Sequence, residues 1–192
     1  MTPFQTTLSA PLPLARCRAD RGLPVPEVEP VPAFRLPADA RALLDHQGGM
    51  TAALEAYWGE PMGLRLIHAA HAPKLIRRQV LLSGTLRQRP AELGLIEIHL
   101  HALPAQVRDG VLAADMPFGT LLTRAGLSFR STPSAFLRLA ADADLADWLD
   151  VTPGHILYGR HTHLTDRHGG TLAEAVEILS GHAPDGRTVP LS

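Results

Sequence analysis

The segment from residue 156 to residue 179 is the feature that most constrains how this chain folds. Its two apolar-rich halves, ILYGRHTHLTD and TLAEAVEIL, flank the dipeptide Gly169-Gly170, which is typical of the turn of a β-hairpin. The second half also fits a helical period, but the glycine turn before it favours a strand. Glu177 lies in this second half. Because an unpaired carboxylate is costly to bury, we expect it to be paired, protonated or facing a polar pocket.

The length and composition are sufficient for a single domain with a hydrophobic core, because the chain has 192 residues and 45% of them are hydrophobic. A formal net charge of −1 argues against a protein that grips nucleic-acid phosphates. No run approaches the ~20 apolar residues of a membrane span, and the start of the chain lacks the pattern of a secretory signal. Cys17 is the single cysteine, which excludes an internal disulfide. We therefore expect a cytoplasmic monomer or small homo-oligomer, with no nucleic-acid partner and no membrane span.

Residues 1–36 differ in composition from the rest. Seven prolines interrupt any helical or strand period there: Pro3, Pro11, Pro13, Pro24, Pro26, Pro30 and Pro32. Such a stretch predicts an extended, weakly ordered N-terminal arm. A folded domain over residues 37–192 is expected to follow it.

The domain mixes the two kinds of periodicity. Helical spacing predicts helices over residues 38–44, within 48–59 (after Thr51 as N-cap), over 104–122 (broken at MPFG) and over 134–150. Alternation predicts strands over residues 63–70, 74–84 and 94–103, with a polar loop at 86–93. Short connections between strands favour antiparallel pairing. We therefore predict an α+β fold with a single antiparallel sheet and helices on one side.

Arg78 is the strongest candidate for binding a ligand from a strand. It alternates with Ile76, Val80 and Leu82, so it shares their apolar face. Arg78 and Glu177 projecting into a common pocket would suit a carboxylate-bearing substrate, because a guanidinium binds a carboxylate through two parallel hydrogen bonds. The alternative is a structural ion pair between these two residues within the sheet.

Other polar residues allow competing interpretations. Arg160 shares a face with apolar residues, so it is either a second inward arginine that binds substrate or a structural arginine satisfied by the protein. His99 with His101, and His161 with His163, could each ligate a metal ion. No metal-binding signature accompanies them, and a solvated strand face is the commoner explanation. The sequence contains neither a P-loop nor GxGxxG.

Five short segments stand in the same order as motifs of one enzyme family. They are GGMT (48–51), RRQVLLSG (77–84), MPFGTLL (116–122), LYGRHTHL (157–164) and GGTLAEAVEIL (169–179). Over roughly residues 40–180 the chain thus resembles chorismate lyase, also called chorismate–pyruvate lyase. The resemblance implies a six-stranded antiparallel sheet, a ligand buried beneath helical flaps, and removal of pyruvate from chorismate to leave 4-hydroxybenzoate. It also implies that neither a metal nor an organic cofactor takes part.

The resemblance carries over to particular residues by position. It makes Glu177 the catalytic acid and Arg78 the arginine that binds a substrate carboxylate. Met50 matches the methionine over the ring, while Phe118 and Gly119 match a Leu-Gly pair at the substrate.

One departure from the family concerns the second substrate carboxylate. In the best-known branch an arginine on the strand after Arg78 holds it, and counting along this sequence puts Leu95 there, with Glu97 two residues on along the same face. Arg160 or a histidine would then have to contribute.

The leading hypothesis from the sequence is a chorismate lyase-type enzyme acting on chorismate or a similar cyclic carboxylate. The alternative is a non-catalytic, effector-sensing domain of the same fold, as in some bacterial repressors. Only about 36 proline-rich residues precede the domain, which is too few for the DNA-binding winged helix of such repressors. A third possibility is a relative whose active site has decayed.

Overall fold

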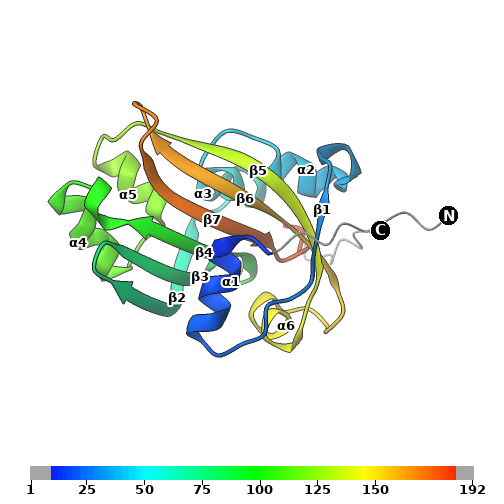
Figure 1. The fold of residues 1–192 in the computed structure, drawn as a ribbon. Helices are drawn as coiled ribbons and strands as arrows, with labels where there is room; N and C mark the ends of the chain where they lie inside the picture. The colour runs from blue at the N-terminus through cyan, green and yellow to red at the C-terminus, as the bar shows by residue number, and fades with distance from the viewer. Residues whose placement is uncertain (1–9, 185–192) are drawn as a thin grey trace.

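The computed structural model describes residues 10–184, in which one antiparallel sheet of seven strands is packed with six α-helices (Figure 1). The strands are β1 (Val28–Val31), β2 (Met62–Ala72), β3 (Leu75–Gly84), β4 (Pro90–His99), β5 (Phe129–Ala140), β6 (Ile156–Asp166) and β7 (Thr171–Leu179). The helices are α1 (Leu12–Asp20), α2 (Ala38–Leu44), α3 (Met50–Trp58), α4 (Ala105–Ala113), α5 (Phe118–Arg124) and α6 (Ala143–Leu149). The strand order is β1-β5-β6-β7-β4-β3-β2. The α+β class with a single antiparallel sheet is confirmed, with one strand more than the resemblance implies.

The closing hairpin forms as predicted. β6 and β7 pair antiparallel, with Arg160 opposite Glu177. Asp166 holds the turn, because its Oδ1 accepts the backbone N–H groups of His168 and Gly170, each at 2.8 Å. Gly169 has a φ of 83°, which glycine adopts without steric cost. The strand interpretation of TLAEAVEIL is therefore confirmed.

The helical prediction for residues 134–150 is wrong over its first part. β5 spans Phe129–Ala140 and pairs with β6 along its length. A short apolar run fits both periods, so its long-range pairing partner decides its structure. Only the segment after it forms α6, whose N-cap Asp142 accepts the Leu145 N–H at 2.9 Å.

The N-terminal segment is a further correction. Residues 1–9, which include Pro3, lie outside the described residues. From residue 10 onward the segment contains α1 and β1, where the proline content predicts a weakly ordered arm. Pro13 lies in the first turn of α1, where a missing N–H breaks no helical hydrogen bond. β1 adds an edge strand beside β5.

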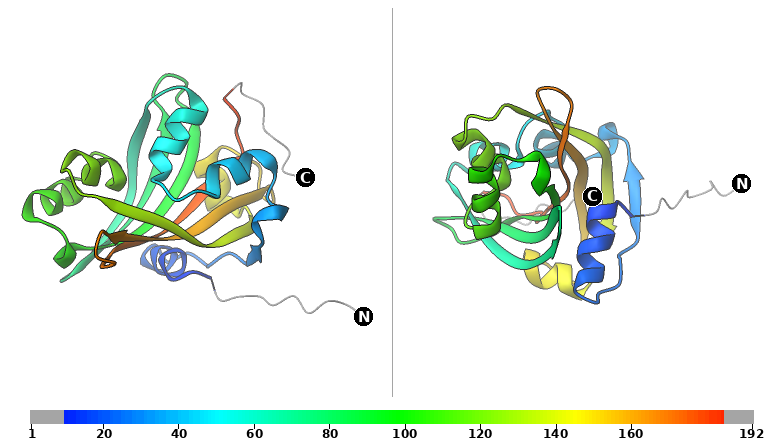
Figure 2. Two further views of the ribbon diagram at one scale, coloured as in Figure 1. Left: turned by 90° about the horizontal axis from the view of Figure 1, so that it is seen from above. Right: turned by 60° about the vertical axis from the view of Figure 1, so that its left-hand side comes forward.

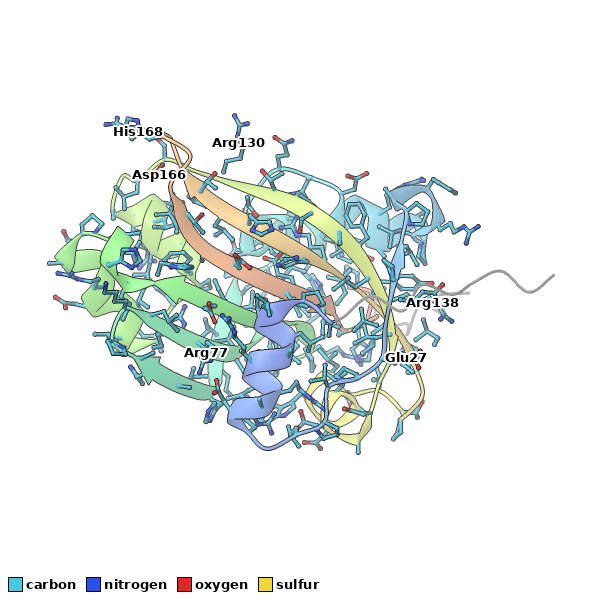
Figure 3. The ribbon with its side chains drawn as sticks, viewed as in Figure 1. Glu27, Arg77, Arg130, Arg138, Asp166 and His168 are labelled. Atoms are coloured by element: carbon cyan, nitrogen blue, oxygen red, sulfur yellow. The ribbon has the colours of Figure 1, made fainter. Side chains whose placement is uncertain are left out.

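Ion pairs hold α1 against the rest of the domain. Arg18 is 1% exposed and pairs with Asp142 and Asp144 at the start of α6. Arg77 of β3, which lies beside α1 in Figure 3, pairs with Asp20 at 2.6 Å. The sequence of residues 10–36 alone could not predict these ion pairs, because the partner residues lie at least 57 positions away along the chain.

Helices cover both faces of the sheet (Figure 2). α2 to α5 lie on one face, and α1 lies on the other. There Leu14 and Cys17 of α1 join Leu145 and Leu149 of α6 in one buried cluster with strand residues. The sheet therefore has a second helical layer in addition to the one predicted.

The face under α2 to α5 carries two separate buried clusters. α2 and α3 pack with Leu82 and Tyr158, whereas α4 and α5 pack with Ile96, Ile98 and Leu164. The starts of α3 and α5 approach each other where the two clusters meet, and a pocket lies at this junction.

Candidate functional site

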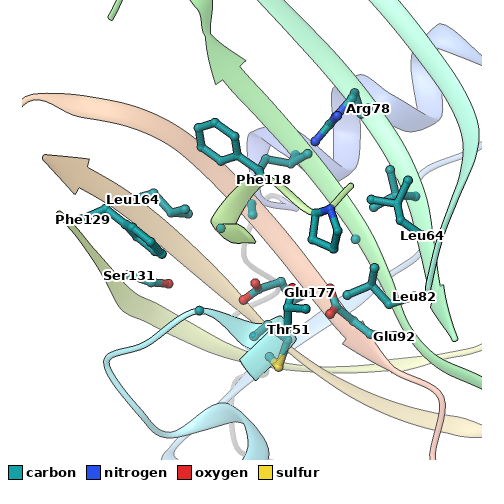
Figure 4. Close-up of a pocket in the computed structure, with 18 residues that line it drawn as sticks. Thr51, Leu64, Arg78, Leu82, Glu92, Phe118, Phe129, Ser131, Leu164 and Glu177 are labelled. Atoms are coloured by element: carbon teal, nitrogen blue, oxygen red, sulfur yellow. The ribbon is translucent and has the colours of Figure 1, made fainter. Parts of the chain in front are cut away.

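The pocket has the sheet as its floor and the two helix starts as its roof. The centre of a water-sized sphere can move through about 80 Å³ of it, and its free space, including the open mouth, is about 640 Å³. Strands β3, β4, β6 and β7 supply the floor, and the start of β5 supplies one wall. Among the predicted site residues, five line this pocket: Met50, Arg78, Phe118, Gly119 and Glu177. The structure therefore brings them together (Figure 4).

Arg78 projects into the pocket from β3. Its side chain is 1% exposed, and its Nη1 donates to the Val111 carbonyl at 3.1 Å. Its Nε is buried and has no hydrogen-bond partner among residues 10–184. Burial lowers the pKa of Arg78 to about 10, opposed by the negative charge of Asp115. A buried guanidinium with an unused donor is favourable only if an anion or another acceptor meets it.

Glu177 reaches the pocket from β7. Its Oε2 accepts the Arg160 Nε–H at 2.5 Å and the Thr162 hydroxyl at 3.0 Å. Both hydrogen bonds are made to Oε2, and Oε1 takes part in neither of them. The pair that the sequence offers as an alternative, Arg78 with Glu177, does not form; the partner of Glu177 is Arg160.

Arg160 lies behind Glu177, and the residues that line the pocket do not include it. Its side chain is fully buried. Nη1 donates to the carbonyls of Leu44 and His46, each at 3.0 Å, and Nη2 donates to the Gly48 carbonyl at 3.1 Å. Of the two interpretations of Arg160, this geometry is that of a structural arginine satisfied by the protein. It ties the loop before α3 to the sheet and to Glu177.

Glu92 is a pocket residue that the sequence analysis missed. β4 begins at Pro90, inside the segment predicted as a polar loop, so Glu92, Gly94 and Ile96 alternate into the pocket. Burial raises the pKa of Glu92 well above its usual range; the charge on Glu177 raises it further, and Arg160 opposes both. A Cβ at Gly94 would lie 3.2 Å from Glu92 Oε1, so glycine leaves room for this side chain. The alternation of Glu92 with Ile96 was the signal that could have found it.

Leu95 faces away from the pocket. It is fully buried in the cluster under α1 and α6, and Glu97, on the same side of β4, pairs with Arg16 at 2.8 Å. Leu95 therefore does not occupy the position of the second arginine, because it lies on the opposite face of β4 from the pocket. The pocket side of β4 carries the acid Glu92 instead.

The roof consists of two helix N-termini. Gly49 and Pro117 are the N-caps of α3 and α5, and within the described chain no side chain caps either helix; the N-cap is thus Gly49 where Thr51 was expected. The first N–H groups of a helix have no intrahelical acceptor and carry partial positive charge. The Phe129 ring lies under both helix starts, 3.6 Å from a Cβ built at Gly49 and 3.5 Å from one at Gly119.

The other candidate residues do not assemble into a site in the described part of the chain. No group of three or more His, Cys, Asp or Glu residues there could hold a metal ion. His161 and His163 lie with their ring centroids 4.8 Å apart, near Glu174. Burial raises the pKa of Cys17 to about 12. No helix between residues 10 and 184 has the length and apolar character required to cross a membrane.

Comparison with known proteins defines the fold. No family model matches the chain, and no curated protein matches it in sequence. PhnF from Mycobacterium smegmatis is similar in structure, with a TM-score of 0.55 and 13% identity over 70% of this chain and 64% of that one. The chain thus spans less than two thirds of PhnF.

Two shorter structures are matched over more of their length. The effector domain of PhnF gives a TM-score of 0.54 with 12% identity, over 69% of this chain and 88% of that one. The gene product SA0254 from Staphylococcus aureus subsp. aureus N315 gives 0.53 with 10% identity, over 71% and 90%. The chain therefore has the α+β fold of such effector domains, which is related to the fold of chorismate lyase.

Proposed function

We propose that this protein is a non-catalytic sensor domain whose pocket binds a small anionic metabolite. The observation that carries the proposal is Arg78, which lines the pocket and whose buried Nε has no partner within residues 10–184. The N-terminus of α3 adds partial positive charge from the roof. The likeness to the effector domain of PhnF supports the same reading.

The hydrogen bonds of Arg160 link the ligand pocket to the segment that precedes α3. Glu177 touches the ligand space on one side and Arg160 on the other. Arg160 in turn donates to the carbonyl of Leu44, at the end of α2, and to those of His46 and Gly48 in the loop before α3. A ligand that repositions Glu177 would therefore change the contacts that hold the segment before α3.

A lyase acting on chorismate is the second candidate, supported by the presence of Met50, Arg78, Phe118, Gly119 and Glu177 in one pocket. Two features argue against it. Chorismate is a dianion, and among the described residues that line the pocket Arg78 is the only arginine or lysine, which leaves the second carboxylate without a cation. One oxygen of the Glu177 carboxylate also accepts hydrogen bonds from Arg160 and Thr162, so protein donors already occupy it.

A thermal-shift screen followed by a product assay tests the two functions together. Chorismate, 4-hydroxybenzoate, other small ring acids and sugar phosphates are added one at a time to the purified protein. The sensor proposal expects at least one anion to raise the unfolding temperature and expects no pyruvate to be released from chorismate. Release of pyruvate that is lost in Glu177→Ala would establish the lyase instead. A cytoplasmic location and a monomeric or small homo-oligomeric state stay predictions.

A further inference from the structure

Two carboxyl groups occupy the end of the pocket that lies away from Arg78. Gly94 of β4 is opposite Glu177 of β7, so Glu92, two residues along on the same face, is the diagonal neighbour of Glu177. Such neighbours are separated by about 7–8 Å at the backbone, within reach of long side chains. Figure 4 shows both carboxyl groups directed into the same part of the pocket, with the guanidinium of Arg78 at the other end.

These two carboxyl groups differ in what already binds them. Glu177 has Arg160 and Thr162 as donors. Glu92 is 3% exposed, and its Oε2 has no hydrogen-bond partner in the part of the chain that the structure describes. A buried carboxyl oxygen without a donor is an unmet hydrogen bond. A donor on the ligand would satisfy it, in the same way that an anionic group would satisfy the Nε of Arg78.

We infer that the ligand is a small amphoteric molecule whose anionic group binds Arg78 and whose protonated amine binds between Glu92 and Glu177. This inference rests on the proposed function and adds the chemical class of the ligand. The charges balance, because Arg160 neutralises Glu177, Arg78 neutralises the anionic group, and Glu92 neutralises the ammonium. A cation next to two carboxyl groups is favoured, because it stabilises their ionised forms.

Binding of the amine is coupled to a proton. Burial raises the pKa of Glu92 and so favours its protonated form in the empty pocket, whereas an ammonium beside Glu92 favours the ionised form. The Glu92 carboxyl therefore releases one proton to solvent as the ammonium forms its ion pair. Of the neighbouring charged groups, Arg160 remains bound to Glu177, and His46 in the loop beside it stays neutral near pH 7 because burial lowers the pKa of its ring. Affinity for the amine thus rises with pH, up to the pKa of Glu92 in the empty pocket.

Isothermal titration calorimetry with two matched probes tests the inference. 4-(Aminomethyl)benzoate and 4-(hydroxymethyl)benzoate share the ring and the carboxylate and differ in the cation. We expect the amine to bind about tenfold more tightly or better, since hydrogen bonds to charged groups are the strong ones. Repeating the titration in two buffers of different ionisation enthalpy should show a proton released with the amine only.

Variants assign the effect to Glu92. Glu92→Gln keeps the shape of the neutral acid, so it should bind the hydroxymethyl probe as the wild type does, lose the preference for the amine and release no proton. Glu97→Gln, on the opposite face of the same strand, should retain both. Equal binding of the two probes by the wild type without proton release overturns this inference alone. Failure of both probes to bind at millimolar concentration overturns the proposed function with it.

Discussion

Removal of the Arg160 side chain is the perturbation for which the structure gives the clearest magnitude. Arg160→Ala leaves the Glu177 carboxylate, whose side chain is 13% exposed, without its cation. It also leaves the backbone carbonyls of Leu44, His46 and Gly48 without their donor. Breaking a buried ion pair by removing one partner costs about 3–5 kcal/mol. A domain of ordinary stability has about 5–15 kcal/mol in total. The variant should therefore lose a large fraction of its free energy of unfolding.

Urea unfolding, followed by the fluorescence of Trp58 and Trp148, measures this loss. Arg138→Ala is the matched control, because Arg138 pairs with Glu29 at 3.1 Å with side chains 40% and 45% exposed. Such a surface pair contributes about 0–1 kcal/mol. A loss below about 1 kcal/mol in Arg160→Ala, equal to that of the control, would refute the reasoning that Arg160 holds the loop and the site together.

Three further predictions follow from the burial of single groups. Arg78→Met should weaken binding of every anion found in the thermal-shift screen by about tenfold or more, and unchanged affinities would contradict this prediction. The urea midpoint should not fall, because the charged guanidinium is itself costly to bury: burial lowers the pKa of Arg78 to about 10. Glu92 has a raised pKa in the folded state, so stability should fall as pH rises from the unfolded value of about 4.3 through the folded pKa. Thermal unfolding across this range should show that fall in the wild type and not in Glu92→Gln, and parallel curves would count against it. Cys17, whose pKa burial raises to about 12, should not react with a disulfide reagent near pH 8 until urea unfolds the protein; rapid labelling of the folded protein would be the contrary result.

The parts of the fold that could be predicted are those with a local signal. The glycine turn predicted the β6–β7 hairpin, and alternation around Arg78 put that residue on the face with Ile76, Val80 and Leu82. Because Glu177 also alternates with apolar residues, both side chains could be assigned to one pocket, and the structure places them there.

What could not be predicted depends on distant partners. α1 is stabilised by Arg18 with Asp142 and Asp144, pairs that no window of local sequence contains. Arg160 was left open between two roles, because its carbonyl partners belong to a loop more than 100 residues away. Glu92 was missed because it lies in the segment predicted as a polar loop, residues 86–93, whereas the strand begins at Pro90. A first strand residue is one of the positions where proline is tolerated.

The central claim is that a ligand satisfies the two buried groups that the protein leaves unmet. A crystal structure of the protein with an amphoteric ring acid such as 4-(aminomethyl)benzoate tests it most directly. The account predicts the carboxylate of the ligand within hydrogen-bond distance of Arg78 Nε and the amine within that distance of Glu92 Oε2. A ligand seated outside the pocket, or inside it with Arg78 Nε still lacking an acceptor, would contradict the account.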